Sequence, residues 1–354
     1  MPRTDRVTIG VPVYRGEPFV EETLRSLQAQ THKDIEVIIS FDGPEPATEE
    51  LCRPFLKDSR FRLTVRPERL GWVGNINWLM SQVQTPFWCY QQQDDLVDPR
   101  YLEVLIEHAH KAPEAAVVFC DIVAFGLQSW KLAQPSVTGS ASARQLALLY
   151  EHHPSAAFRG LTRVEALRHA GGIRTNEVEN FSADTTWMAA VARWGELRRV
   201  PVEMYRKRYH EENTHTKWQT WSKEKRGRAW VVHCADMLEQ AMLVEATAQE
   251  RRLLWLAAVA RLVSPRTASG YISFPDMRPA ERVSLLDAFI EHVRTARPMN
   301  MTRLLRAGWD EIRQWTEGFY EQPPPDAREF LGRCRRFAVS RILATRAFGR
   351  GGKV

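Results

Sequence analysis

The sequence predicts an α/β fold, in which a mostly parallel sheet is flanked by helices and followed by an all-α C-terminal extension. Over about 120 residues, short apolar runs of strand length alternate with stretches of helical periodicity, as in βαβ units. Beyond Trp218 only the helical pattern continues. We therefore expect an α/β domain at residues 1–217 and a helical region at residues 218–354.

The expected strands are residues 7–11, 35–41, 61–65, 87–90 and 116–120. Residues 35–41 are nearly all apolar, which is typical of a strand buried on both faces of a sheet. The first helix is expected to bury Val20, Leu24 and Leu27, which recur at helical spacing. In the C-terminal region, residues 225–263 have the periodicity of one long helix.

The composition is that of an ordinary globular protein, with 44% hydrophobic and 26% charged residues. No apolar run is long enough to span a bilayer, and the N-terminus lacks the apolar core of a signal peptide. The five cysteines include no Cys-x-x-Cys pair, which argues for reduced thiols and against a structural zinc site. These features predict a cytoplasmic protein.

The net charge of +6 is concentrated near the C-terminus. Residues 1–217 carry 26 Lys and Arg against 28 Asp and Glu, whereas residues 218–354 carry 23 against 15. The sequence pI of about 9.1 raises nucleic-acid binding as an alternative function. Because the basic excess belongs to the tail and no known binding motif accompanies it, we expect no nucleic-acid partner.

The basic tail, residues 326–354, interleaves arginines with Phe330, Phe337 and Ile342. This pattern is compatible with a helix docked on the helical region. It is equally typical of an amphipathic helix that makes peripheral contact with the inner face of an anionic membrane. Both interpretations remain open from the sequence.

Two adjacent carboxylates, Asp94 and Asp95, follow the strand at residues 87–90. The carboxyl ends of strands in an open α/β sheet are where such sheets bind ligands. Paired acids also suit Mg²⁺ or Mn²⁺ shared with phosphates. For an isolated Asp-Asp pair, a polar loop that caps the next helix would be the preferred interpretation. Asp42 likewise follows a strand, in the turn signal Asp-Gly-Pro.

Several segments, taken in order, resemble the inverting nucleotide-sugar glycosyltransferases of family 2, which have the GT-A fold. They are VTIGVPVY, EETLRSLQAQT, EVIISFDG, GWVGN, QQQDDLVDPRYL, SADTTWMAAVARWG and YRKRYHEENTHT. The resemblance covers roughly residues 5–217. It implies transfer of a sugar from a nucleoside-diphosphate sugar, UDP-linked, to a hydroxyl of a glycan or glycoconjugate acceptor. Surface polysaccharide or glycoconjugate synthesis is the expected setting.

The resemblance also implies roles for individual residues. Asp94 matches the family's principal metal ligand, and His210 matches a His that approaches the diphosphate and the metal. Asp184 matches the catalytic base, although an Asp before a helical stripe is also a common N-cap. Gln92 and Gln93 stand where the family often has an acid, so the expected Mn²⁺ or Mg²⁺ would have fewer anionic ligands.

The remaining donor-side residues follow from the same resemblance. The predicted donor-binding set is Pro12, Val13, Tyr14, Asp42, Asn75, Asp95, Arg206 and His210, with Arg66 and Arg208 as weaker candidates. Asp42 would accept hydrogen bonds from the base, and the basic residues would neutralise phosphate charge. His152, His153 and Gly160 are expected on the acceptor side.

Two further interpretations compete with this one. A nucleotidyltransferase would need a glycine- and lysine-rich phosphate loop near the first strand, and VPVYRGEP is not such a loop. A non-catalytic glycosyltransferase-like binding protein is the other alternative, because of Gln92 and Gln93.

Overall fold

A computed structural model describes residues 5–150, 154–211, 213, 217–218, 220–263 and several positions between 285 and 295. The chain groups into two compact units. The first comprises Met1–Gly139, Pro154–Thr175 and Ala183–Asn213, and the second Ser140–His153, Asn176–Ser182 and Thr214–Val354. The second unit therefore includes two segments that precede residue 217. The predicted basic tail, residues 326–354, lies outside the described residues, as do His152, His153 and His215.

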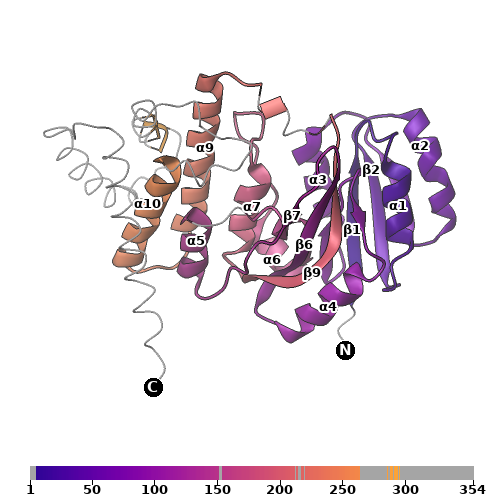
Figure 1. Cartoon of the computed structure of the whole chain (residues 1–354), viewed down its shortest axis with the longest axis horizontal. Helices are drawn as coiled ribbons and strands as arrows, with labels where there is room; N and C mark the ends of the chain where they lie inside the picture. The colour runs from indigo at the N-terminus through magenta and orange to yellow at the C-terminus, as the bar shows by residue number, and fades with distance from the viewer. Residues whose placement is uncertain are drawn as a thin grey trace, which may run out of the picture. The chain divides into compact units, whose positions relative to one another are not determined.

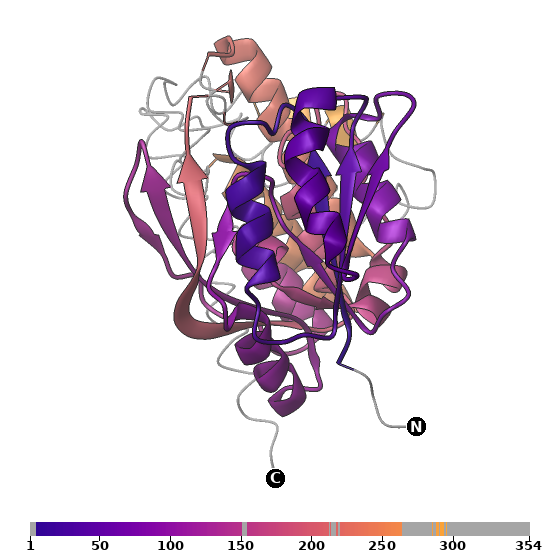
Figure 2. The same ribbon diagram turned by 90° about the vertical axis from the view of Figure 1, so that its right-hand side faces the viewer.

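The described part of the first unit contains one mixed sheet of nine strands (Figures 1 and 2). They are β1 (Val7–Val13), β2 (Ile35–Phe41), β3 (Phe61–Val65), β4 (Phe87–Tyr90), β5 (Leu96–Val97), β6 (Ala115–Gly126), β7 (Lys131–Leu132), β8 (Leu161–Arg163) and β9 (Glu196–Tyr209). The order is β3-β2-β1-β4-β8-β6-β9-β5, with β7 beside β6. Strands β1 to β4 pair in parallel, while β8 lies antiparallel between β4 and β6.

Helices of the first unit connect and flank these strands (Figure 1). They are α1 (Val20–Gln28), α2 (Pro46–Cys52), α3 (Gly71–Ser81), α4 (Tyr101–Lys111), α6 (Val164–Ala170) and α7 (Ala183–Val191), with 3₁₀ turns at Arg53–Lys57 and Ala157–Arg159. As predicted, α1 buries Val20, Leu24 and Leu27. The predicted α/β class, a sheet flanked by helices, is confirmed. The three-residue β8 was not predicted, because so short a strand has no readable alternation.

The close packing of β1 against β4 depends on a glycine. A Cβ atom at Gly10 would lie 2.1 Å from the ring of Trp88, so no larger residue fits without displacing the indole. The parallel register pairs Val13 with Phe41 and Gly10 with Tyr90. Consequently β1, β2 and β4 end at the same edge of the sheet, which is the edge where α/β sheets bind ligands.

The described part of the second unit contains α5 (Ala141–Tyr150), α9 (Lys223–Met242) and α10 (Ala248–Val263). The prediction of one helix over residues 225–263 is wrong. A capping box begins a new helix at Thr247, whose N–H donates to Glu250 Oε2 at 2.8 Å while the Glu250 N–H donates to Thr247 Oγ1 at 3.2 Å. The Thr-x-x-Glu spacing was visible in the sequence. Among the described residues, no helix combines the length and apolar character needed to cross a membrane.

Candidate active site

Asp94 and His210 meet at the edge of the sheet. Asp94 lies in the loop after β4, and His210 directly follows β9. The imidazole Nε2 is 2.8 Å from Asp94 Oδ2, although the residues are 116 positions apart. Asn213 Nδ2 approaches the same oxygen at 3.4 Å, and the side chain of Asp94 is 14% exposed. The structure thus brings together the two predicted metal ligands.

The side chain of Asp95, unlike that of Asp94, points into the fold, and the residue is 1% exposed. Its carboxylate accepts hydrogen bonds from the Tyr205 hydroxyl and the Arg208 backbone N–H, both at 2.8 Å. Arg159 Nε lies 3.6 Å from the same carboxylate. Burial, assisted by the charge of Asp94, raises the pKa of Asp95 above its ordinary value. The predicted donor-binding role of Asp95 does not fit, because its oxygens are engaged by protein groups inside the fold.

The two glutamines before the acids are also engaged. Gln93 clamps the backbone of Tyr14: its Oε1 accepts from Tyr14 N–H and its Nε2 donates to Tyr14 O, each at 2.8 Å. Gln92 Oε1 accepts a 2.5 Å hydrogen bond from Arg159 Nη2. The glutamine amides therefore hold the loop to β1 and to Arg159.

The predicted base-binding residues lie where β1 and β2 end. Asp42 is buried, and its Oδ1 accepts a 2.6 Å hydrogen bond from Leu70 N–H, while Oδ2 is 3.7 Å from Arg69 Nε. The Arg69 guanidinium covers the ring of Tyr14, 3.6 Å from its centroid. Together with Pro12, these groups form a polar and aromatic edge suited to a nucleobase. Sequence reasoning missed Arg69.

Two predicted donor residues and one predicted acceptor-side residue have other roles. The side chain of Val13 is fully buried in the core. Asn75 is 1% exposed, and its amide bonds only Ser40: Oδ1 accepts from Ser40 Oγ at 2.6 Å and Nδ2 donates to Ser40 O at 2.9 Å. Gly160, expected on the acceptor side, packs against β6, where a Cβ would lie 2.5 Å from Val118 O. Each of these predictions came from the resemblance to the family, which assigns positions in the chain and not the directions of side chains.

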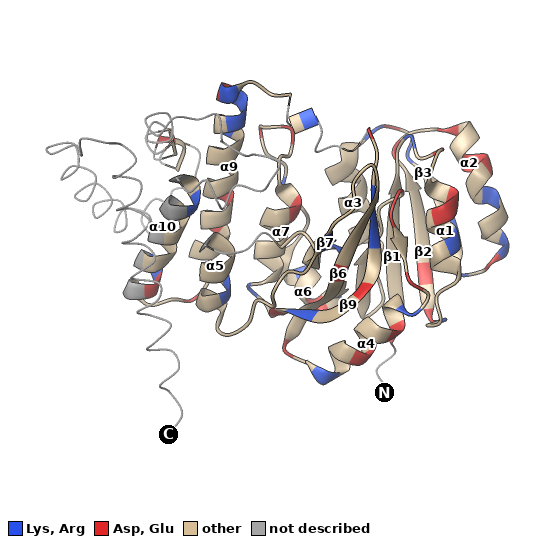
Figure 3. Cartoon of the chain, in the orientation of Figure 1, with Lys and Arg blue, Asp and Glu red and all other residues tan. Residues whose placement is uncertain are grey.

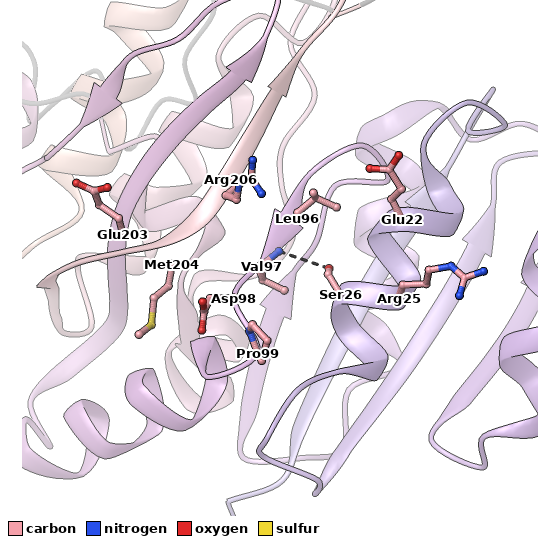
Figure 4. A pocket seen from close by; sticks show the side chains of 10 residues that line it. All are labelled: Glu22, Arg25, Ser26, Leu96, Val97, Asp98, Pro99, Glu203, Met204 and Arg206. Carbon is pink, nitrogen blue, oxygen red and sulfur yellow. Dashed lines mark hydrogen bonds between the residues drawn. The ribbon is translucent and has the colours of Figure 1, made fainter.

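Arg206 is the third donor residue whose side chain points elsewhere. It is exposed and stacks on Phe125, with its guanidinium 4.7 Å from the ring centroid. Figure 4 shows it beside Leu96 and Glu22 in a groove lined by α1, β5 and β9. Arg208 lies on the same face of β9 and pairs with Glu22 at 2.6 Å. Successive side chains of a strand point to opposite faces, so Lys207 points away from this groove.

Besides Arg69, sequence reasoning missed two charged residues of the site, Lys207 and Arg159. Burial and the nearby Arg159 lower the pKa of Lys207 to about 8, while the charges of Asp95, Asp184 and Asp94 act in the opposite direction. The ammonium group therefore lies within electrostatic reach of all three carboxylates. Lys207 belongs to a run of basic residues at the end of β9 (Figure 3). Neighbouring side chains of a strand point to opposite faces, and this was the only signal in the sequence that Lys207 and Arg206 differ in direction.

Asp184, the predicted base, lies in the first turn of α7 and is partly exposed, whereas most other residues of the helix are buried. Its Oδ1 accepts a 2.9 Å hydrogen bond from Thr185 N–H. Ser182, just before the helix, has a φ of 54°, a left-handed conformation that is costly for a non-glycine residue. The Asp184 carboxylate interacts electrostatically with Lys207 and Arg159.

The edge of the sheet where α/β proteins bind ligands thus carries a carboxylate–imidazole pair and a separate carboxylate. Such a set of groups is typical of an enzyme that uses acid–base chemistry. Residues 8–171 match the model of the family described as Glycosyl transferase family 2. EpsH of Bacillus subtilis, a putative glycosyltransferase, is 26% identical over 213 residues, which are 58% of this chain and 56% of EpsH. The chain spans a smaller share still of other curated relatives.

Solved structures show the same fold. Residues 1–349 of Staphylococcus aureus TarS, in complex with UDP-GlcNAc, align with a TM-score of 0.62 at 12% identity, covering 90% of this chain and 92% of that one. The mannosyltransferase PcManGT of Pyrobaculum calidifontis, in complex with GDP-Man and Mn²⁺, aligns with a TM-score of 0.52 at 15% identity, covering 96% and 86%. The first unit thus has the GT-A fold, and residues 8–171 are similar to the glycosyltransferases of family 2.

Proposed function

We propose that the chain is an inverting glycosyltransferase that transfers a sugar from a UDP-sugar to a hydroxyl group of a glycan or glycoconjugate acceptor. The observation that carries the proposal is the geometry of three groups. Asp94 and His210 form a pair at the sheet edge, and Asp184 stands apart from them, partly exposed at the start of α7. One carboxylate is sufficient as base, because inversion requires a single proton acceptor.

In the proposed reaction, Asp184 takes the proton of the acceptor hydroxyl as its oxygen bonds to the anomeric carbon. The bond from that carbon to the diphosphate oxygen breaks, and UDP leaves with the electron pair. By analogy with glycoside hydrolysis, the transition state is oxocarbenium-like, so negative charge collects on the departing diphosphate. Positive groups beside Asp94 therefore assist departure.

The residues present fit a divalent cation. The 2.8 Å between His210 Nε2 and Asp94 Oδ2 is close to the roughly 3 Å that separates neighbouring ligands of a cation bound at about 2.1 Å. No cluster of three or more His, Cys, Asp or Glu side chains suited to a metal occurs in the described part of the chain. Mg²⁺-like cations commonly use one or two protein ligands and complete their coordination with substrate phosphates. When bound, Mn²⁺ or Mg²⁺ would neutralise the diphosphate.

UDP is the proposed nucleotide for two reasons. The Asp42 carboxylate can accept the N3–H of uracil, and Arg69 Nε, 3.7 Å from Asp42 Oδ2, can donate to a neighbouring carbonyl. In addition, TarS, which shares the fold, has been solved with UDP-GlcNAc. Surface polysaccharide or glycoconjugate synthesis is the proposed setting, as the resemblance to the family implies; the relatives' names support glycosyl transfer.

The test is a thermal-shift screen of UDP-, GDP- and dTDP-sugars, with Mn²⁺ and with EDTA, followed by NMR of the product of the best donor. UDP-sugars should raise the melting temperature, and an α-linked donor should yield a β-linked product. Failure of every nucleotide sugar to bind would contradict the proposal. Retention of the anomeric configuration would contradict its inverting mechanism.

A further inference from the structure

We propose that Arg208 is a positioning residue of the donor site, which fixes the backbone of Asp94 so that the Asp94 carboxylate faces His210. The inference rests on the proposed function, in which Asp94 and His210 hold the cation. Its basis is two hydrogen bonds from β9 to the adjacent acids. Arg208 Nε donates to the Asp94 carbonyl at 3.0 Å, and the Arg208 backbone N–H donates to Asp95 Oδ1 at 2.8 Å. One residue thus holds both acids.

The Arg208 side chain is itself held by groups from α1 and β6. Its Nη2 donates to Glu22 Oε2 of α1 at 2.6 Å. Its guanidinium lies 4.7 Å from the ring centroid of Phe19, just before α1, and 4.6 Å from that of Phe125 on β6. The side chain is 14% exposed, compared with 59% for Glu22. A planar guanidinium packs on aromatic rings and bonds two acceptors at once, so this environment fixes an arginine in one place.

Phe19 holds the second predicted metal ligand as well. Its ring packs on the His210 imidazole, with the two centroids 4.8 Å apart, and the His210 N–H donates to Asn213 Oδ1 at 2.9 Å. The same ring therefore contacts both the imidazole and the guanidinium that holds Asp94. Arg208 and Phe19 together thus set the 2.8 Å distance between the carboxylate and the imidazole. Removal of a group that orients metal ligands typically weakens metal binding 10- to 100-fold.

A direct bond from Arg208 to the diphosphate is the competing role, and the two roles differ in whether the metal is involved. The experiment measures Mn²⁺ affinity in the presence of UDP by electron paramagnetic resonance, and UDP affinity in EDTA by calorimetry. Arg208→Met should weaken Mn²⁺ binding roughly 10- to 100-fold and leave the UDP affinity in EDTA unchanged, which also shows that the variant is folded.

Two further variants sharpen the test. Arg208→Lys should weaken Mn²⁺ binding nearly as much as Arg208→Met, because an ammonium group lacks the planar fork that bonds Glu22 and the Asp94 carbonyl at once. If Arg208→Met does not fold, Phe19→Leu takes its place with the same expected results, since the Phe19 ring is only partly buried.

Arg206→Met is the matched control. Arg206 lies two positions away on β9 and packs on the same ring of Phe125, at 4.7 Å. Its side chain lines the groove in Figure 4, and in the described part of the chain no hydrogen bond joins it to Asp94 or Asp95. Its substitution should therefore leave the Mn²⁺ affinity unchanged.

The outcomes separate this inference from the proposed function. An unaltered Mn²⁺ affinity in Arg208→Met would overturn the inference. A lower UDP affinity of Arg208→Met in EDTA would also overturn it, and would assign Arg208 to the diphosphate. If the unaltered protein bound UDP but no Mn²⁺, the inference would fail while the transfer reaction could stand. If the unaltered protein bound no nucleoside diphosphate, the proposed function itself would fail.

Discussion

Substitutions of the two adjacent acids should have different effects. Asp95→Asn should lower the stability of the fold, whereas Asp94→Asn should mainly impair nucleotide binding. Asp95→Asn removes the negative partner of Arg159, whose Nε is 3.6 Å away, and turns an amide toward the Tyr205 hydroxyl and the Arg208 N–H. Removing one partner of a buried pair costs about 3–5 kcal/mol, because the remaining charge stays desolvated. For a domain of 150–250 residues this corresponds to a decrease in melting temperature of roughly 6–20 °C.

The measurement is urea and thermal unfolding of Asp95→Asn beside Asp94→Asn and Glu50→Gln. The Asp94 side chain is 14% exposed, so its substitution should impair nucleotide binding more than stability. Glu50 forms an exposed ion pair with Arg53 at 2.6 Å, and its loss should cost less than about 1 kcal/mol. If Asp95→Asn unfolds at the same urea concentration as the unaltered protein, the buried network contributes no stability and the reasoning is refuted.

Four further outcomes test the site. Asp184→Asn should lower turnover at least about 100-fold with UDP affinity nearly intact, since a base acts in the chemical step; near-normal turnover would exclude it as base. Asp94→Ala should remove the part of the UDP affinity that EDTA abolishes, as measured by calorimetry. If neither Asp94→Ala nor EDTA changes the UDP affinity, no metal binds at Asp94. As the pH rises through about 8, Lys207 loses its proton, and with it a positive charge that interacts electrostatically with Asp94 and Asp184, so kcat/KM should fall. Lys207→Arg should move this alkaline limb upward; an unmoved limb would assign it to another group. Arg206→Met should leave UDP affinity unchanged, whereas a marked loss would restore its predicted donor role.

Helix limits in the second unit show how far local signals reach. The periodicity of residues 225–263 continues through the break between α9 and α10, so a pattern count predicts one helix. The capping box formed by Thr247 and Glu250 outweighs that periodicity, because it satisfies backbone N–H groups that a new helix start leaves unpaired. The Thr-x-x-Glu spacing is a local signal present in the sequence, and it predicts the start of a new helix at this point.

The sequence by itself determined the fold class and the similarity to the glycosyltransferases of family 2. Apolar runs such as residues 35–41 need burial on both faces, and that requirement is met by a strand inside a helix-flanked sheet, whatever the details of packing. The motif order from VTIGVPVY to QQQDDLVDPRYL is likewise carried by the linear sequence, and the family match over residues 8–171 agrees with it.

Only the tertiary structure decided which charges meet. Asp94 and Asp95 are chemically identical in the sequence, yet the pairing of Val97 with Tyr205 between β5 and β9 brings the Tyr205 hydroxyl to Asp95 and leaves Asp94 to His210. The same pairing directs Lys207 to the acids and Arg206 to the groove. The physical reason is that a strand's two faces are interchangeable until its register is set, and a one-residue shift would exchange them.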